Sequence, residues 1–368
     1  MSRPVKALLV IAALLLMSAV ICVGGLLIVS GGEPVDFIQT ALVQLRLAGR
    51  QDDLARSISS DTTPIRFTIE SGDTPRVIAA KLAADNLIVD ADLFVDYVRV
   101  SELDRELEAG VYFLTRAQTI PDIAVSLTDS RSSQFPFRIL EGWRLEEIVD
   151  VVDRTPYFGF SGDDFMRVVG PGASQDTSFA AFVGLPASAS LEGFLYPDTY
   201  QLPAAVTPEM LRDILLDQFI AEVGTQLRAE AEREGLTLFE AVTLGSIIQR
   251  EAVRVDEHPR IASVYRNRLR DGMKLDADPT VQYGIGFENG TWWPQITQAD
   301  YTQAVSPFNT YLNFGLPPGP IASPGIDAIT AAINPEQTPY FYFRARCDGS
   351  GYHNFAVTFE EHVANGCQ

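Results

Sequence analysis

Residues 237–253 read TLFEAVTLGSIIQREAV, and this stretch predicts a buried helix. Thr237 and Glu240 have the spacing of a capping box, in which the two side chains satisfy backbone N–H groups at the helix start. The predicted helix then extends from Leu238 to about Val253. Apolar and small residues share one of its faces, namely Leu238, Ala241, Val242, Gly245, Ile248 and Ala252. The stretch therefore indicates a helix that packs into the core of an α+β domain.

Glu251 lies at the edge of that apolar face, about one turn after Ile247 and two turns after Leu244. A carboxyl group that packs against apolar side chains has a raised pKa, because burial disfavours its charged form. A general acid that works near neutral pH needs such a pKa. The alternative is a solvated Glu251 paired with Arg250 or Arg254. Periodicity alone favours this alternative.

A long helix is predicted before this stretch. Thr207 is its expected cap and Pro208 occupies its first position, where the missing N–H costs nothing. The helix is expected to end near Glu234, since a glycine follows.

Residues 128–190 are predicted to form a connecting α+β subdomain. A strand is expected at 135–140 and a helix at 145–152. Residues 158–188 are rich in Gly, Ser, Ala and Asp, a composition typical of loops, so we expect little regular structure there.

Residues 65–127 show an order of strand, helix, helix and strand. The first strand is predicted at 66–70, where apolar and polar residues alternate, and a proline-initiated helix follows. A second helix is predicted at 91–98, and 107–114 reads as a turn and a returning strand. A βααβ unit of this size resembles a LysM-like module, a common glycan-binding unit. The alternative is a unit that serves only for packing.

The N-terminus carries a predicted membrane anchor. Arg3 and Lys6 precede an apolar run at 7–29, and Glu33 and Asp36 follow it. The run has about the ~20 residues that cross a bilayer. Positive charge before it predicts a cytoplasmic N-terminus, with the rest of the chain outside. A cleaved signal peptide would have a shorter apolar core and a small-x-small cleavage site. We therefore expect an uncleaved single span.

The composition excludes several classes of protein. The formal net charge of −20 argues against nucleic-acid binding, which depends on Lys and Arg, and against a polybasic grip on lipid. The chain has three histidines, and its cysteines lack metal-site spacing, so neither a metal nor a cofactor is expected. Cys347 and Cys367 form either a disulfide or two free thiols.

Several long motifs in order resemble the YceG-like family of endolytic murein transglycosylases, and the resemblance covers nearly the whole chain. The motifs are FRILEGWRL (137–145), LEGFLYPDTYQL (191–202), GSIIQREA (245–252), ASVYRNRLRDGMKLDADPTVQYGIG (262–286), PFNTYLNFGLPPGPIASPG (307–325) and YHNFAVTFEEH (352–362).

The resemblance implies a role for Glu251. The family commonly shows an S-I-[IV]-E-K-E stretch whose second Glu is catalytic, and that position corresponds to Glu251. The first Glu corresponds to Gln249, which lies about 160° round the helix from Glu251 at ~100° per residue. The implied reaction protonates the MurNAc–GlcNAc glycosidic oxygen. The MurNAc C6 hydroxyl then attacks C1 and leaves a 1,6-anhydro-MurNAc end.

A hydrolytic muramidase on the same groove is a rival hypothesis, because most glycosidases use two carboxylates. The available second carboxylates are Glu192, Asp198, Asp276 and Asp278. A LysM-bearing scaffold without enzymatic activity is a third hypothesis.

Other polar and aromatic residues are weaker candidates for substrate binding. Tyr283 and Tyr311 can stack on sugar rings, although aromatic side chains more often belong to the core. Asn309 can bind an N-acetyl group, with turn formation as the alternative. Asp278 either caps the segment after it or binds sugar hydroxyls, and Glu192 completes the candidate set.

The predicted fold class is α+β, in five parts. They are a cytoplasmic tip with a transmembrane anchor (1–30), a stalk (31–64), the LysM-like module (65–127), the connecting subdomain (128–190) and a catalytic domain (191–368). The family resemblance implies peptidoglycan strands as substrate and work beside peptidoglycan synthases, where the enzyme would terminate nascent strands.

Overall fold

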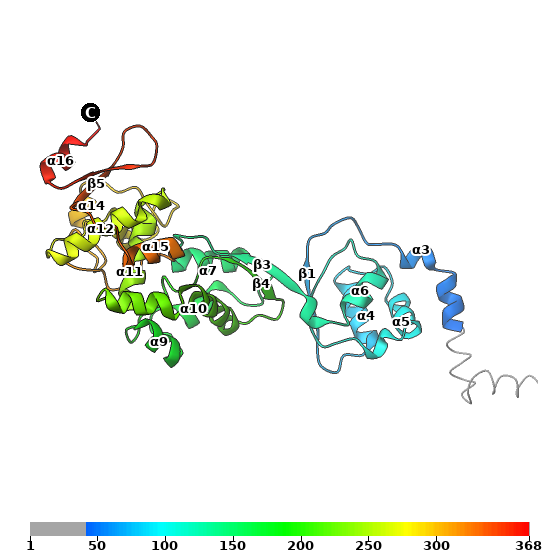
Figure 1. Ribbon diagram of the computed structural model, residues 1–368. Helices are drawn as coiled ribbons and strands as arrows, with labels where there is room; N and C mark the ends of the chain where they lie inside the picture. The colour runs from blue at the N-terminus through cyan, green and yellow to red at the C-terminus, as the bar shows by residue number, and fades with distance from the viewer. Residues whose placement is uncertain (1–41, 368) are drawn as a thin grey trace, which may run out of the picture. The chain divides into compact units, whose positions relative to one another are not determined.

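The structure is a computed structural model that describes residues 42–367 (Figure 1). The predicted anchor at 7–29 lies outside the described residues. Within 42–367, no helix combines the length and apolar character needed to cross a membrane. The chain divides into two compact units, one extending to Gln134 and the other beginning at Phe135.

The first unit has the predicted βααβ order. Strand β1 (Ile65–Ile69) pairs antiparallel with β2 (Gly110–Leu114). The helices between them are α4 (Pro75–Ala84) and α5 (Ala91–Val100), followed by the 3-10 turn η1 (Leu103–Arg105). Helix α6 (Ile120–Ser126) and the turn η2 (Ser130–Ser132) complete the unit.

Part of the predicted stalk belongs to this unit. Residues 42–48 are helical, and α3 (Gln51–Leu54) follows. Val43 and Leu47 are buried in the same core as Phe67 of β1. Their apolar side chains therefore stabilise the unit by removing surface from water.

The second unit begins with β3 (Gln134–Arg138), which forms a two-stranded sheet with β4 (Thr199–Pro203). The predicted helix α7 (Leu145–Arg154) follows β3. The sheet thus joins the predicted connecting subdomain to the segment that precedes the long helix.

The prediction of a loop at 158–188 is wrong, because this segment contains α8 (Gly162–Val169) and α9 (Thr177–Val183). Ser161 and Asp176 accept hydrogen bonds from backbone N–H groups at the two helix starts. The Ser and Asp content that indicates a loop is here a set of helix caps. Phe165 and Phe179 bury the apolar faces.

The long helix α10 (Pro208–Arg233) begins at the predicted Thr207 cap, but it is not continuous. Gly224 interrupts it with φ 62° and ψ 177°. Only glycine adopts that backbone conformation without a steric penalty.

Helix α11 (Leu238–Glu251) lies in the core of the second unit and has the predicted capping box. A Cβ atom on Gly245 would lie 3.2 Å from the Cα of Ile329, so the glycine permits a close approach to α15 (Ile326–Ile333). The buried hydroxyl of Ser246 accepts a hydrogen bond from Ile321 N–H at 3.0 Å.

The remaining elements surround the end of α11. They are the 3-10 turn η3 (Val255–Glu257), α12 (His258–Arg270), α13 (Asp278–Ile285), α14 (Asp300–Gln303), β5 (Tyr342–Ala345), β6 (His353–Ala356) and α16 (Phe359–Ala364). Strands β5 and β6 pair antiparallel. Cys347 and Cys367 form a disulfide, which decides between the two predicted states of these cysteines.

Candidate active site

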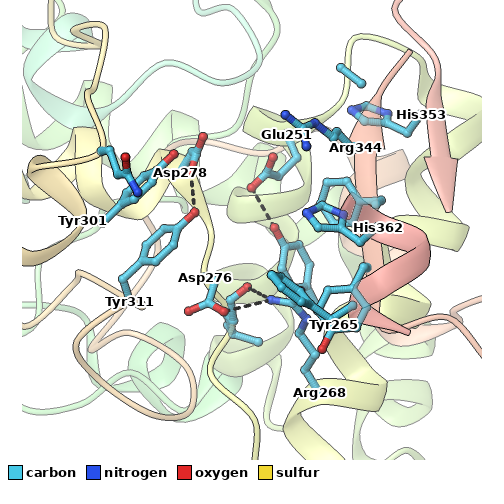
Figure 2. A pocket seen from close by; sticks show the side chains of 16 residues that line it. Glu251, Tyr265, Arg268, Asp276, Asp278, Tyr301, Tyr311, Arg344, His353 and His362 are labelled. Atoms are coloured by element: carbon cyan, nitrogen blue, oxygen red, sulfur yellow. Dashed lines mark hydrogen bonds and ion pairs between the residues drawn. The ribbon is translucent and has the colours of Figure 1, made fainter. Parts of the chain in front are cut away.

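A cavity of about 820 Å³ opens beside the last residue of α11. Figure 2 shows the side chains that line it. They come from α11, α12, the start of α13, the 298–311 segment, the β5–β6 hairpin and α16. Elements that are more than 100 residues apart in the sequence therefore build one site.

Glu251 points into this cavity and accepts a hydrogen bond from the Tyr265 hydroxyl of α12, with a distance of 2.7 Å to Oε1 (Figure 2). Burial raises the pKa of Glu251 to about 7, and the negative charge of Asp278 acts in the same direction. The Tyr265 hydrogen bond and the positive charge of Arg268 oppose that rise. The carboxyl also ends its helix, where the helix dipole disfavours negative charge.

The two arginines proposed as solvated partners of Glu251 have other contacts. Arg254 donates to the carbonyl oxygen of Ser350 at 2.9 and 3.0 Å. The guanidinium of Arg250 lies over the Trp293 ring, 3.8 Å from its centroid. The carboxyl of Glu251 is therefore left for the cavity.

Arg268 forms the floor beside Glu251 and is 7% exposed. It donates to the carbonyl oxygens of Phe341 and Leu275, both at 2.6 Å, and lies 3.5 Å from an Asp276 carboxylate oxygen. Burial raises the pKa of Asp276. Arg268 thus joins α12 to the segments on either side of the cavity.

Asp278 and Tyr311 form the opposite side, as Figure 2 shows. Asp278 is the first residue of α13. Its side chain does not cap this helix, because among the described residues no side chain accepts a hydrogen bond from the backbone N–H groups at the helix start. Its Oδ1 accepts the Tyr311 hydroxyl at 2.7 Å. Tyr301 stacks on Tyr311 with ring centroids 4.1 Å apart. Burial raises the pKa of Tyr311 well above its usual value, so its hydroxyl remains a donor.

The described residues that line the cavity do not include Glu192, Tyr283 or Asn309. Glu192 is buried, and its two oxygens each accept Leu145 N–H at 3.0 Å, while the Tyr283 hydroxyl lies 3.3 Å away. Burial raises the pKa of Glu192 to about 8, and the charge of Glu146 adds to the rise. The carboxyl of Glu192 therefore fixes the start of α7.

Asn309 is also buried and orders its own loop. Its side-chain amide donates to the carbonyl oxygens of Tyr301 and Ala304 and accepts Tyr311 N–H at 2.9 Å. Asn309 thereby positions the two stacked tyrosines that line the cavity.

Gln249, which stands where the family commonly has a glutamate, makes two structural hydrogen bonds. Its Oε1 accepts Gly325 N–H at 3.0 Å, and its Nε2 donates to Glu141 at 3.2 Å. A side-chain amide supplies both bonds, whereas a carboxylate could only accept. The side chain that replaces the family's first Glu therefore joins α11 to the turn after β3 and to the start of α15.

Sequence reasoning did not single out most of the cavity lining, including Tyr265, Arg268, Tyr301, Arg344, His353 and His362. No local pattern could have grouped them, because they lie on separate elements that meet only in the folded chain.

Comparisons with known proteins agree with the motifs. The model of the YceG-like family matches residues 67–368. The endolytic murein transglycosylase of Bacillus subtilis is 30% identical over 314 residues, which cover 82% of this chain and 83% of that protein. The endolytic murein transglycosylase of Streptococcus pneumoniae strain D39 is 26% identical over 324 residues, and the chain spans 57% of that relative's length. A crystal structure of a yceG-like protein from Listeria monocytogenes aligns with TM-score 0.55 and 29% identity, covering 82% of this chain and 98% of that one.

Proposed function

The chain belongs to the YceG-like family, and from that premise we propose that it is an endolytic lytic transglycosylase that cleaves MurNAc–GlcNAc bonds in peptidoglycan. The observation that carries the proposal is the carboxyl group of Glu251, which faces the 820 Å³ cavity and has a pKa of about 7.

Such a carboxyl group can act first as an acid and then as a base. With a pKa near neutral pH, both protonation states are populated, which is the condition for proton transfer in either direction. Protonated Glu251 gives its proton to the glycosidic oxygen, and the C1–O bond breaks. The resulting carboxylate takes the proton of the MurNAc C6 hydroxyl, whose oxygen bonds to C1. The product is a 1,6-anhydro end, and no water is consumed.

Tyr265 and Arg268 suit the second half of this cycle, because both stabilise the carboxylate form of Glu251. They keep its pKa from rising beyond the range in which it can lose a proton. We therefore assign Tyr265 a positioning role through its 2.7 Å hydrogen bond to Glu251.

A hydrolytic muramidase is the rival that one observation favours. Asp276 and Asp278 line the same cavity as Glu251, so a second carboxylate is present on the site. Such an enzyme would activate a water and leave reducing ends. The chemistry of the product separates the two reactions.

The test is digestion of purified peptidoglycan by the full-length protein in detergent, with mass spectrometry of the products. Wild type is expected to give 1,6-anhydro-MurNAc ends, and Glu251→Gln to lose at least about a hundredfold in rate. Glu288→Gln is the control, because it removes an equal charge from an exposed side chain away from the cavity. Reducing ends would support the muramidase. Equal rates for wild type and Glu251→Gln would refute the assignment of the acid.

We propose that the enzyme is a single-pass membrane protein with its catalytic unit outside the cytoplasm. The sequence pattern of 1–36 supports this, and so does the Cys347–Cys367 disulfide, since disulfides persist mainly in oxidising compartments. Labelling an introduced cysteine from either side of intact cells would test the orientation.

We propose further that the βααβ module at 65–127 is LysM-like and binds glycan, and that the enzyme terminates strands beside peptidoglycan synthases. The order and antiparallel pairing of β1 and β2 support the first part. A glycan-binding unit without cleavage would be the scaffold alternative. Retention of glycan binding in Glu251→Gln together with full cellular function would favour that alternative.

A further inference from the structure

A buried carboxylate–histidine pair stands at the rim of the cavity, apart from Glu251. Glu257 is 3% exposed and its oxygen lies 2.7 Å from Nδ1 of His353. Both oxygens of Glu257 also accept the backbone N–H of His353 at 3.1 Å. The ring and the backbone of His353 are thus held by the same carboxylate.

The pair joins two parts of the site. Glu257 ends η3, six residues after Glu251, while His353 begins β6 of the C-terminal hairpin. Phe343 of β5 packs edge-on against the imidazole, with ring centroids 5.4 Å apart. These contacts fix the plane of the imidazole ring and therefore the direction in which its Nε2 edge points.

His353 lines the cavity together with Glu251 (Figure 2). A carboxylate oxygen only accepts hydrogen bonds, so Nδ1 of His353 carries the hydrogen in this contact. Its other ring nitrogen, Nε2, has no hydrogen-bond partner within residues 42–367, and it is not among the buried polar atoms left unpaired there. Nε2 is the polar atom that His353 has left for a ligand.

We propose that His353 is a substrate-contacting residue whose Nε2 hydrogen-bonds a hydroxyl or N-acetyl amide of the glycan, and that Glu257 is the positioning residue that orients it. This inference rests on the proposed function. Sugar hydroxyls and amides both donate and accept, so Nε2 finds a partner in either role. The hydrogen bond that a carboxylate makes with one histidine nitrogen determines whether the other nitrogen is protonated.

Two substitutions of the same residue separate this role from a structural one. His353→Asn places an amide near the Nδ1 position, so it keeps a bond to Glu257 and removes the Nε2 edge. His353→Gln places its amide near the Nε2 position and loses the Nδ1 contact. We expect His353→Asn to lower kcat/KM by about tenfold, the worth of one hydrogen bond. We expect His353→Gln to retain more activity even though it is the less stable variant, because it loses the Nδ1 contact with the buried Glu257.

Glu257→Gln tests the positioning residue. Its amide can donate to Nδ1 and so allow the opposite tautomer of His353. We expect an intermediate loss in kcat/KM and no change in which products form. The reverse order, with His353→Asn as active as wild type and His353→Gln impaired, would mean that the pair only holds the hairpin and would overturn the proposal.

A binding measurement tests the His353 contact independently of whether the protein cleaves glycan. Peptide-free glycan strands are titrated into Glu251→Gln and into the double variant with His353→Asn, both as full-length protein. Weaker binding by the double variant supports the contact even if wild type cleaves nothing. Equal binding, together with equal kcat/KM of His353→Asn and wild type, refutes it. Absence of cleavage by wild type alone counts against the transglycosylase function.

Discussion

Tyr265→Phe is the most informative perturbation of the site, because it removes one hydroxyl and leaves the buried ring in place. That hydroxyl donates to Glu251 at 2.7 Å, and its hydrogen bond holds the pKa of Glu251 down against burial. Tyr265 is 1% exposed, so water has little access to replace the bond.

The size of the effect follows from the strength of the bond. A hydrogen bond to a charged group contributes about 1.5–3 kcal/mol. One pKa unit corresponds to about 1.4 kcal/mol, so the loss should raise the pKa of Glu251 by about 1–2 units. The starting value is about 7. An acid must be protonated to act, so activity that declines as pH rises through 7 should now decline at a pH about 1–2 units higher.

The assay is kcat/KM on purified peptidoglycan from pH 5 to pH 10. Tyr340→Phe is the control, since its hydroxyl makes no hydrogen bond in the described part of the chain and it lies outside the cavity lining. We expect the basic limb of Tyr265→Phe to move upward while that of Tyr340→Phe stays in place. An unmoved limb in a folded Tyr265→Phe protein would refute Glu251 as the acid that the limb reports.

Three further outcomes are expected. Glu251→Gln should be more stable than wild type at pH 8 but not at pH 4, by up to about 3 kcal/mol in calorimetric unfolding. The pKa of Glu251 is about 7 in the folded state and 4.5 in the unfolded state. The contribution of Glu251 to the stability of the wild type is therefore fully present below pH 4.5 and is lost as pH rises through 7. Asp278→Asn should slow cleavage but still give only 1,6-anhydro ends by mass spectrometry, whereas a muramidase that needs this second carboxylate would lose about 10²–10⁴ in rate. Reduction of the Cys347–Cys367 disulfide, which spans 20 residues, should lower the free energy of unfolding by about 2–4 kcal/mol and lower activity, because the loop that it closes carries His353. A thermal scan unaffected by reductant would contradict this.

The local sequence determined much of this protein. The capping box at Thr237 and Glu240 and the period of the apolar residues predict α11, because both act within a few residues of chain. The alternation at 66–70 and the helix signals after it predict the βααβ unit for the same reason. The family motifs single out Glu251 as the candidate acid. The prediction at 158–188 rested on amino-acid composition and not on hydrophobic periodicity. It failed because Ser and Asp are favoured both in loops and at helix caps.

Only the tertiary structure decided what surrounds Glu251. On its own helix this residue is predicted to be a solvated carboxylate. In the folded chain burial raises its pKa, and the charge of Asp278 in α13 adds to the rise. Tyr265 and His353 lie 14 and 102 residues further along the chain than Glu251, so no spacing rule connects them with it. The same packing buries Glu192 and Asn309 away from the cavity, although both stand in prominent motifs. Desolvation and long-range hydrogen bonds depend on which helices and strands pack together. The sequence determines that packing only through the fold of the whole chain.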